Sequence, residues 1–309
     1  MTPPPRVLAV CADDFGLAPG ISAGIARLAR AGRLTAISCL TNSAHWARAA
    51  PLLASLPATV DVGLHLNFTE GRPLSPRLAK RWPQFPALPQ LIARAHLGAL
   101  PRGALRNEAH AQLAAFIHAR GAAPAFIDGH QHVHHLPGLR DLILDMLEHI
   151  QPLPAMRSTG RLLGPGFAVK RALIDRTGGR ALAAELARRE IAHNPALLGA
   201  YDFKTPAYRA LMQGWLAALP AEGGLLFCHP GDGVGAPSLT ADPPAADAPP
   251  AAVAAAAAPA TQPDPIAAAR LRESAYLGSA AFQQDLAAAG VTLGRVWQVR
   301  PAGQVRQTR

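Results

Sequence analysis

The chain of 309 residues contains only three cysteines, Cys11, Cys39 and Cys228. They are odd in number, lie far apart in the sequence and form no C-x-x-C pair. This pattern excludes a disulfide framework and a thiolate metal site, both of which need paired or closely spaced cysteines. We therefore expect the three thiols to be small buried side chains.

Aromatic residues are also scarce, at 5% of the chain, although the formal net charge is +10. The positive charge is almost entirely arginine, and it is spread along the sequence without the block of about five or more basic residues that marks an interaction tail. Without aromatic residues interleaved among basic ones, the chain has no stacking platform for bases. The composition therefore argues against nucleic acid as a partner.

The sequence also lacks an uninterrupted apolar stretch of about eighteen residues, the length that a membrane-spanning helix needs. Residues 1–6 run straight into a predicted strand and lack the basic, apolar and cleavage regions of a secretory signal. We therefore expect no membrane partner and a cytoplasmic location.

Hydrophobic residues make up 50% of the chain and charged residues 16%, which is typical of a globular protein with a substantial core. Short apolar runs, interpreted as buried strands, alternate with amphipathic stretches, interpreted as helices. The expected strands are 6–12, 35–40, 60–66, 126–128, 156–158, 225–228 and 291–299. The expected helices are 21–31, 44–56, 104–120, 136–150 and 266–277.

This alternation of strands and helices favours a parallel α/β architecture. We expect one domain over residues 1–309, with a Pro-rich connection at 71–101. From about 234 to 263 the sequence is rich in Ala and Pro, so we expect a flexible low-complexity loop inserted into this domain.

A run of histidines follows the strand expected at 126–128: four of the six residues in His130-Gln131-His132-Val133-His134-His135 are histidine. Neutral imidazole is the commonest protein ligand for a divalent metal. An α/β barrel places its chemistry at the carboxyl ends of its strands, where this run stands. The run therefore indicates a metal site, and the alternative is a solvated polar loop.

Two further strands carry polar residues near their carboxyl ends. Asp13 and Asp14 end the first strand, where paired carboxylates could divide the work, one binding a metal and the other accepting a proton from water. The alternative for this pair is N-capping of the next helix. Side chains alternate between the two faces of a strand, so His65 projects from the face of the third strand opposite its aliphatic residues. The alternative is that His65 is a buried, hydrogen-bonded histidine without a role in the site, as a lone histidine usually is.

His229 directly follows the apolar strand 225–228 and could act as a general acid toward a leaving group. Arg157, at the end of the fifth strand, could orient a carboxylate or stabilise developing negative charge, and we count it among the substrate-binding residues. If the sheet is parallel, Asp14, His65, His130 and His229 converge on one site.

Five motifs occur together in an order that resembles the YdjC-like carbohydrate deacetylases, which include the chitooligosaccharide deacetylases. They are Ala12-Asp13-Asp14-Phe15-Gly16-Leu17, Gly63-Leu64-His65-Leu66, Gly71-x-Pro73-Leu74, Asp128-Gly129-His130-Gln131-His132-Val133-His134 and His229-Pro230-Gly231. The resemblance runs from about Arg6 to Val299 and is interrupted by the Ala/Pro-rich insertion. The segment Arg270-x-x-Glu273 also looks like the C-terminal helix of the family.

The resemblance implies a distorted (β/α) TIM-like barrel that binds one divalent metal ion, Mg²⁺ or Zn²⁺. It implies that Asp14, His65 and His130 are the metal ligands and that Asp13 is the general base. It further implies that His229 is the candidate acid and that His132 and His134 line the substrate pocket. Gly129 stands where a serine is frequent in the family, and we expect this difference to be harmless.

The expected function is therefore metal-dependent removal of an N-acetyl group from an N-acetylated sugar or oligosaccharide, with release of acetate. One alternative is another metal-assisted amide or ester hydrolase on a barrel. A second is a non-catalytic metal- or sugar-binding protein, which would have no need for both Asp13 and His229. The sequence leaves open the exact sugar, the native cation and whether the chain forms a homo-oligomer.

Overall fold

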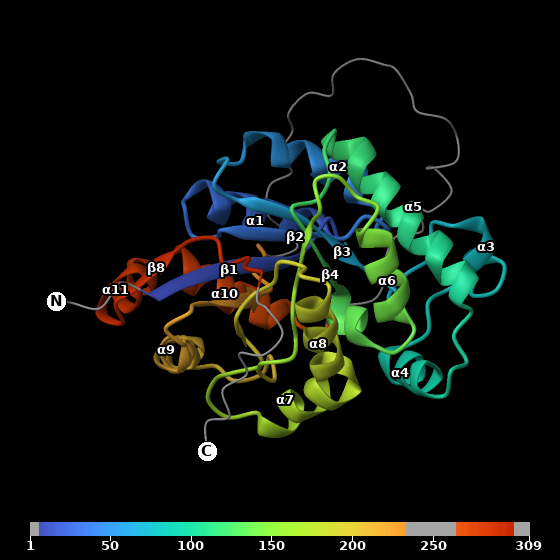
Figure 1. Cartoon of the computed structure of the whole chain (residues 1–309). Coiled ribbons are helices and arrows are strands. Elements are labelled where there is room, and N and C mark those ends of the chain that lie inside the picture. The colour runs from blue at the N-terminus through green and yellow to red at the C-terminus, as the bar shows by residue number, and fades with distance from the viewer. Residues whose placement is uncertain (1–5, 233–263, 300–309) are drawn as a thin grey trace, which may run out of the picture.

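A computed structural model describes residues 6–232 and 264–299 of the chain (Figure 1). The loop expected at about 234–263 lies outside these described residues. Within the described ranges no helix is both long and apolar enough to cross a membrane.

The strands form a single sheet in which every pair of neighbours is parallel. Their order is β5-β4-β3-β2-β1-β7-β6, and β8 also pairs with β1. Because all strands run the same way, their carboxyl ends meet at one edge. The strands are β1 Arg6–Phe15, β2 Ala36–Cys39, β3 Asp61–Leu66, β4 Phe126–Gly129, β5 Ala155–Met156, β6 Leu197–Leu198, β7 Gly224–Cys228 and β8 Val291–Leu293.

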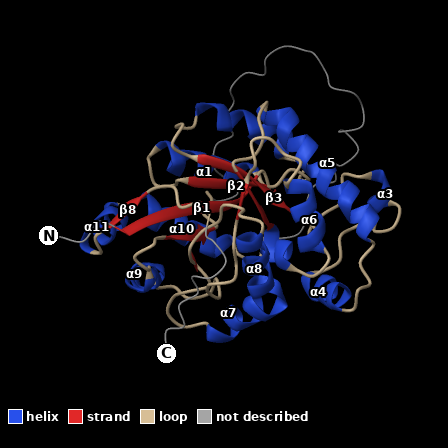
Figure 2. Cartoon of the chain, in the orientation of Figure 1, coloured by secondary structure: helices blue, strands red, loops and turns tan. Residues whose placement is uncertain are grey.

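Helices surround the strands, which occupy the middle of the molecule (Figure 2). The α-helices are α1 Pro19–Arg30, α2 Trp46–Ala49, α3 Pro76–Ala79, α4 Leu88–His96, α5 Arg102–Arg120, α6 Leu139–Leu147, α7 Ala168–Ile174, α8 Arg180–Arg188, α9 Tyr208–Ala218, α10 Ala267–Gly278 and α11 Ala280–Ala288. Short 3₁₀ turns, η1 Ala50–Ser55 and η2 His130–His135, and one π-helical segment, η3 Asp175–Gly179, complete the connections. The predicted parallel α/β class is thus confirmed.

The sheet is a half-barrel, because its two end strands, β5 and β6, do not pair with each other along the described strand path. Isolated bridges lie near the gap instead, joining Met156 to His193 and Leu162 to Leu197. Among the residues that the structure describes, strand pairing therefore does not form the closed ring implied by a TIM-like barrel. Strands of only two residues, such as β5 and β6, cannot supply a continuous ladder across this gap.

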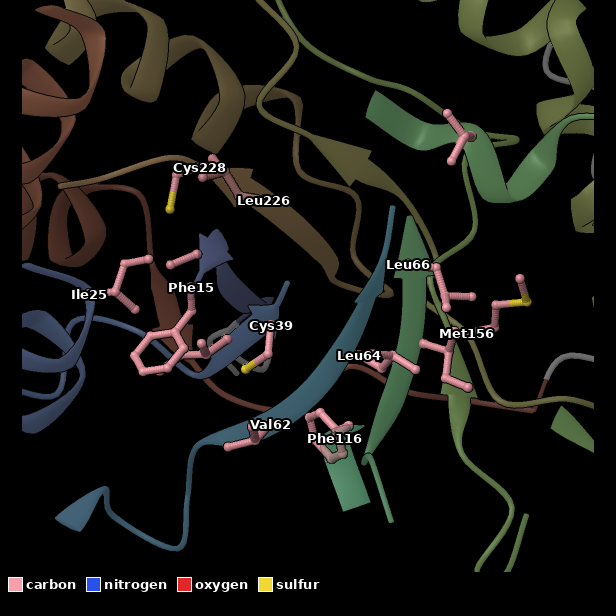
Figure 3. Packing of buried hydrophobic residues seen from close by; sticks show 14 of the residues in the cluster. Phe15, Ile25, Cys39, Val62, Leu64, Leu66, Phe116, Met156, Leu226 and Cys228 are labelled. Atoms are coloured by element: carbon pink, nitrogen blue, oxygen red, sulfur yellow. The ribbon is translucent and has the colours of Figure 1, made fainter. Parts of the chain in front are cut away.

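The main core lies between the sheet and the helices, and α1 shows why these residues form it. Ile21, Ile25 and Leu28 recur at helical spacing and are buried, whereas Arg27 and Arg30 are exposed. Ile25 packs close to the carboxyl end of β1, as Figure 3 shows. Fully burying one such aliphatic side chain stabilises the fold by about 1.5–3 kcal/mol.

A second, smaller core fills the inside of the half-barrel, and many of its side chains are small, such as Ala9, Ala36 and Ala155. Trp297 closes the amino-terminal end of this core, stacking on Phe126 with ring centroids 4.8 Å apart. The indole Nε1 of Trp297 also donates to Asp61 Oδ2 at 2.9 Å. Residues 294–299 therefore cover the edge of the sheet opposite the predicted site.

Several predicted boundaries were wrong. The connection 71–101 contains α3 and α4, both of which have proline in the first turn, where a missing N–H costs nothing. The helix expected at 136–150 begins at Leu139, so Pro137 lies before it. The strand expected at 291–299 ends at Leu293. Helices α7 to α9 and α11 were not predicted, although apolar residues recur at helical spacing in some of them, such as the buried Leu182 and Leu186 of α8.

Candidate functional site

The predicted site residues gather at the carboxyl edge of the sheet. Asp13 and Asp14 lie near the end of β1, and His65 is the penultimate residue of β3. His130 and His229 directly follow β4 and β7. The parallel topology therefore brings together side chains that are more than 200 positions apart in the sequence.

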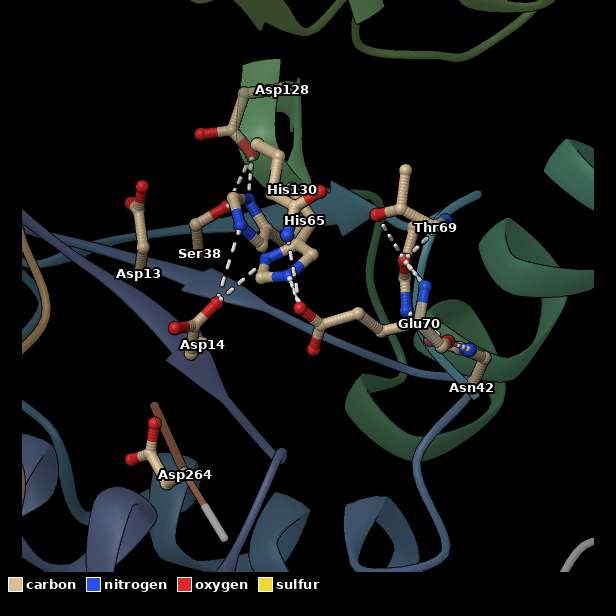
Figure 4. A network of polar contacts seen from close by, with 12 residues as sticks. Asp13, Asp14, Ser38, Asn42, His65, Thr69, Glu70, Asp128, His130 and Asp264 are labelled. Atoms are coloured by element: carbon tan, nitrogen blue, oxygen red, sulfur yellow. Dashed lines mark hydrogen bonds and ion pairs between the residues drawn. The ribbon is translucent and has the colours of Figure 1, made fainter. Parts of the chain in front are cut away.

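Asp14, His65 and His130 form a compact group of metal-binding type, shown in Figure 4. All three are buried, and one ligand atom from each lies within 4.8 Å of the others. Asp14 Oδ1 is 3.0 Å from Nδ1 of His130 and 3.6 Å from Nε2 of His65. The backbone of Asp14 has φ of 70°, a left-handed conformation that costs energy for a non-glycine residue and often marks a functional site.

This geometry fits a metal ion. The two separations from Asp14 Oδ1 are close to the ~3.4 Å that separates neighbouring ligands in a tetrahedron with bonds of about 2.1 Å. Asp14 Oδ1 is buried and accepts no hydrogen bond from the described residues, because the 3.0 Å approach of His130 has an unfavourable angle. A buried carboxylate oxygen without a donor is costly unless a cation faces it.

Carboxylates outnumber guanidinium groups around these residues, which favours a cation there. Asp13, Asp14, Glu70, Asp128 and Asp264 lie around Arg157 and Arg270.

Asp128 orients His65. Its Oδ1 is 2.6 Å from Nδ1 of His65, and it also accepts a 2.5 Å hydrogen bond from Ser38 Oγ. This contact assigns the imidazole proton to Nδ1 and leaves the Nε2 lone pair facing Asp14. Although burial opposes ionisation, Arg157 and His65 keep the pKa of Asp128 below its usual range. Asp128 belongs to one of the five sequence motifs, but the sequence predicted no role for it.

Arg157 is completely buried and holds two carboxylates. It donates to Asp13 in a two-pronged contact, from Nη1 to Oδ2 at 2.7 Å and from Nη2 to Oδ1 at 2.6 Å. Its Nη2 also lies 2.5 Å from Oδ2 of Asp128, at an angle that gives an ion pair and no hydrogen bond. Orientation of a carboxylate is one of the two functions considered for Arg157. Its contact with substrate stays a prediction, to which an exposure of 0% lends no support.

Cys11, Asp13 and Asp128 form a second group with metal-ligand spacing. The guanidinium of Arg157 already supplies the positive charge there, because its Nη2 contacts all three side chains. Burial also raises the pKa of the Cys11 thiol, which disfavours the thiolate that a metal would need. We therefore assign only the Asp14 group as a candidate metal site.

His229 is half-buried between two aromatic rings. Its ring meets Phe203 and Phe227 nearly at right angles, at centroid distances of 5.1 and 5.8 Å. Its backbone N–H donates to Glu273 Oε2 at 2.5 Å, and its buried Nδ1 has no hydrogen-bond partner among the described residues. Burial lowers the pKa of His229 to about 4. The imidazole is therefore neutral at pH 7 and must gain a proton before it can act as an acid.

His132 and His134, predicted to line the substrate pocket, are both buried. The Nε2 of His134 contacts the carbonyl oxygen of Arg157 at 3.0 Å, and its exposure is 0%. The ring of His132 packs edge-on against Phe227 at 4.9 Å. These contacts connect the turn η2 to neighbouring strands, and a contact of either histidine with substrate stays a prediction. A Cβ on Gly129 would lie 2.9 Å from the backbone nitrogen of His134, so the absence of a serine there suits this packing.

Two residues of α10 also reach the site, and sequence reasoning gave them no role. The Nη2 of Arg270 donates to Asp14 Oδ2 at 2.8 Å, and its Nε donates to Asp264 at 2.6 Å. Although burial opposes ionisation, Arg270 and His130 keep the pKa of Asp14 well below its usual range. Glu273 accepts hydrogen bonds from Tyr201 and from the backbone of His229. The Arg270-x-x-Glu273 motif was the signal available for both.

Glu70 is a further residue that sequence reasoning missed. It lies in the loop after β3, and its Oε1 is 3.2 Å from Nε2 of His130. Burial opposes the charged imidazole, but Asp14 and Glu70 outweigh it and raise the pKa of His130 to about 10. Glu70 is a lone acid in a loop, and the signal beside it was the motif Gly71-x-Pro73-Leu74, which begins at the next residue.

A cavity of about 520 Å³ lies away from these residues, beside α3 and the start of α5. Its lining is rich in arginine and contains none of the predicted site residues: Arg77, Lys80, Arg81, Pro101, Arg102, Gly103 and Ala104. The candidate site therefore rests on the convergence of side chains and not on this cavity.

Two curated relatives share part of this sequence. The chain is 36% identical over 171 residues to a carbohydrate deacetylase of Mus musculus, covering 50% of this chain and 53% of the relative. It is 35% identical over 149 residues to a chitooligosaccharide deacetylase of Yersinia enterocolitica, covering 48% and 58%. The chain thus spans about half the length of these curated relatives.

A similar fold occurs in the crystal structure of an Enterococcus faecalis protein whose description concerns cellobiose-phosphate cleavage. The two structures agree with a TM-score of 0.66 and 18% sequence identity, over 94% of this chain and 98% of the other. At this identity the likeness concerns the fold alone. The family described as YdjC-like protein matches residues 7–288, and the chain therefore belongs to that family.

Proposed function

We propose that the protein is a divalent-metal-dependent hydrolase that removes the N-acetyl group from an N-acetylated sugar or oligosaccharide. The observation that carries the proposal is the convergence of Asp14, His65 and His130 beside a second carboxylate, Asp13, that is fixed by Arg157. The names of the curated relatives, carbohydrate deacetylase and chitooligosaccharide deacetylase, support the substrate class.

Asp14, His65 and His130 would hold the metal ion. Two imidazoles and one carboxylate suit Zn²⁺ better than Mg²⁺, which prefers oxygen ligands. Bound there, the cation supplies Lewis-acid chemistry that polarises the acetyl carbonyl and makes water more acidic. Asp128 holds His65 and Arg270 holds Asp14, so the ligand group is oriented before substrate arrives.

The remaining residues handle protons. Asp13 accepts a proton from the attacking water while Arg157 holds its carboxylate in place. Oδ2 of Asp13 retains a second lone pair for this purpose beside its bond to Arg157, whereas Oδ1 also accepts from the thiol of Cys11. The oxygen of water bonds to the acetyl carbon, the carbon–nitrogen bond breaks, and the leaving amine takes a proton. His229 is the candidate donor, after it has gained a proton itself. The products are acetate and a free amino sugar.

The two alternative functions differ in what they require of Asp13 and the substrate. Another metal-assisted amide or ester hydrolase would use the same residues but would act on a different panel of substrates. A non-catalytic metal- or sugar-binding protein would not need Asp13 as a base, and so would not need Arg157 to hold it in place. The buried, two-pronged contact of that pair favours a catalytic protein.

The test is release of acetate from N-acetylated chitooligosaccharides by metal-loaded protein. We expect that removing the metal abolishes turnover and that adding Zn²⁺ restores it. The variant His130→Ala should lose both stoichiometric metal binding and activity, because it deletes one of three ligands. Binding is measured by competition with a chromophoric chelator.

A matched control is His149→Ala, which removes an exposed imidazole just after α6. This variant should keep both metal binding and acetate release. Activity of metal-stripped His130→Ala protein would contradict the mechanism, and hydrolysis of esters or cyclic amides in preference to N-acetyl sugars would favour the first alternative.

A further inference from the structure

His65 shows how this site orients an imidazole. Its Nε2 faces Asp14 Oδ1 at 3.6 Å, and its Nδ1 meets Asp128 Oδ1 at 2.6 Å. One ring nitrogen thus points to the candidate metal site while the other contacts a carboxylate. This is the usual arrangement for a metal-binding histidine, because the carboxylate fixes both the tautomer and the orientation of the ring.

In His130 the roles of the two ring nitrogens are exchanged relative to His65. Its Nδ1 is the nitrogen that faces Asp14 Oδ1, at 3.0 Å, and its Nε2 lies 3.2 Å from Glu70 Oε1. The rings of His65 and His130 are nearly perpendicular, with an angle of 77° and centroids 5.4 Å apart. Figure 4 shows Glu70 reaching His130 from the loop after β3, on the side away from Asp128.

Gln131 holds the same oxygen of Glu70 beside His130. Its Nε2 donates to Glu70 Oε1 at 3.0 Å. The contact between Glu70 and His130 is short enough for a hydrogen bond but not aligned for one, so Nε2 of His130 is buried without a hydrogen-bonded partner among the described residues. Such an unsatisfied nitrogen is costly, and a small rotation toward Glu70 would remove the cost.

The loop that carries Glu70 is fixed from within. Asn67 is buried, and its Oδ1 accepts from the backbone N–H groups of Thr69 at 3.0 Å and Glu70 at 3.1 Å. Its Nδ2 donates to the carbonyl oxygen of Glu70 at 2.8 Å. The main chain of Glu70 is therefore held on both sides, although 44% of its side chain is exposed.

We propose that Glu70 is the positioning residue of His130, accepting the Nε2 proton so that Nδ1 is directed to the metal ion. Glu70 then does for His130 what Asp128 does for His65, with the two ring nitrogens exchanged. The inference rests on the metal site of the proposed function. If Glu70 were only a solvated surface residue, neither the hydrogen bonds from Asn67 that fix its loop nor its hydrogen bond from Gln131 would be needed.

Zinc affinity of the full chain tests this role. Glu70→Ala should bind Zn²⁺ about 10–100-fold more weakly than the unchanged protein, the usual effect of losing a carboxylate behind a metal-bound histidine. Glu70→Gln, which keeps an acceptor oxygen, should fall between them. The matched control is Glu148→Ala, which removes a side chain of similar exposure, 48%, at the end of α6 and should bind Zn²⁺ normally.

The outcomes separate this inference from the proposed function. If the unchanged protein binds Zn²⁺ and Glu70→Ala binds it equally well, the role of Glu70 is refuted while the metal site stands. If the unchanged protein binds no divalent cation, the metal site fails and this inference fails with it. Because the Glu70 side chain is half exposed, its removal leaves no buried cavity, and a thermal melt verifies that the variant is folded.

The ring nitrogen that binds the metal provides a second measurement, independent of activity. Nitrogen-15 NMR of the zinc-loaded, histidine-labelled protein distinguishes coordination through Nδ1 from coordination through Nε2. We expect Nδ1 for His130 and Nε2 for His65. The His130 signals are assigned in the metal-free protein by comparison with metal-free His130→Ala and are then followed as zinc is added to the unchanged protein. Coordination of His130 through Nε2 would overturn the proposal, because that nitrogen could not then donate to Glu70.

Discussion

At the scale of single residues, the two adjacent aspartates of β1 have entirely different partners. Asp13 is held by Arg157 through both oxygens, whereas Asp14 contacts Arg270 through Oδ2 and faces two histidines through Oδ1. Alternation along a strand sends neighbouring side chains to different sides, and the left-handed backbone of Asp14 adds to this separation. The sequence suggested that one aspartate binds a metal and the other accepts a proton. The family resemblance implied that Asp14 is the ligand and Asp13 the base.

Replacing Asp13 with Asn should lower kcat by about two to four orders of magnitude, the usual scale for a positioned acid–base group. Zinc affinity should stay within about twofold, because Asp13 contacts Arg157 and none of the three predicted ligands. Both quantities are measured on the same preparation. Loss of zinc binding in Asp13→Asn would mean that the two aspartates have been assigned the wrong way round.

At the scale of elements, α10 connects two strands of the site. Arg270 and Glu273 are three positions apart and so lie on one face of the helix, where both are buried. One reaches Asp14 at the end of β1, and the other holds the backbone of His229 after β7. The helix thus fixes a predicted metal ligand and the candidate acid relative to each other.

Replacing Arg270 with Met should weaken zinc binding by about 10–100-fold, because Oδ2 of Asp14 loses the donor that orients the carboxylate. Arg270→Lys should retain part of the affinity. Arg27→Gln is the control: Arg27 also bonds α10, through Ser274, but it is exposed and does not touch Asp14. Equal affinity for zinc in Arg270→Met and Arg27→Gln would contradict the role given to α10.

At the scale of the whole molecule, buried histidines make stability depend on acidity. His135 bonds Thr159 and Thr177, and His134 bonds the backbone of Arg157, so η2 is tied to the chain beyond β5. Burial lowers the pKa of His134 to about 4 and that of His135 to about 3. Both rings therefore stay neutral in the folded protein at a pH where the unfolded chain would protonate them.

We expect the free energy of unfolding to fall as the pH drops from about 6.5 toward 4. In that range the unfolded chain binds a proton at each of these histidines and the folded protein does not, so acid favours unfolding. Each contributes at most about 1.4 kcal/mol per pH unit. Thermal melts between pH 7.5 and 4.5 measure the slope, which should become shallower in His135→Gln. An unchanged slope in that variant would refute this assignment.

The sequence by itself determined the parallel α/β class and the polar residues at the strand ends. Both follow from patterns a few residues long, in which apolar runs define strands and the residue after a run lies at the edge of the sheet. Only the tertiary structure decided which of these residues are partners. Arg157 meets Asp13 across 144 positions and Arg270 meets Asp14 across 256. The strand order separates β5 from β1 by three strands, so Arg157 reaches Asp13 across the inside of the curved sheet, and α10 packs beside α1, which follows β1. No local pattern encodes such distant contacts, and Glu70, a lone acid in a loop, shows the same limit.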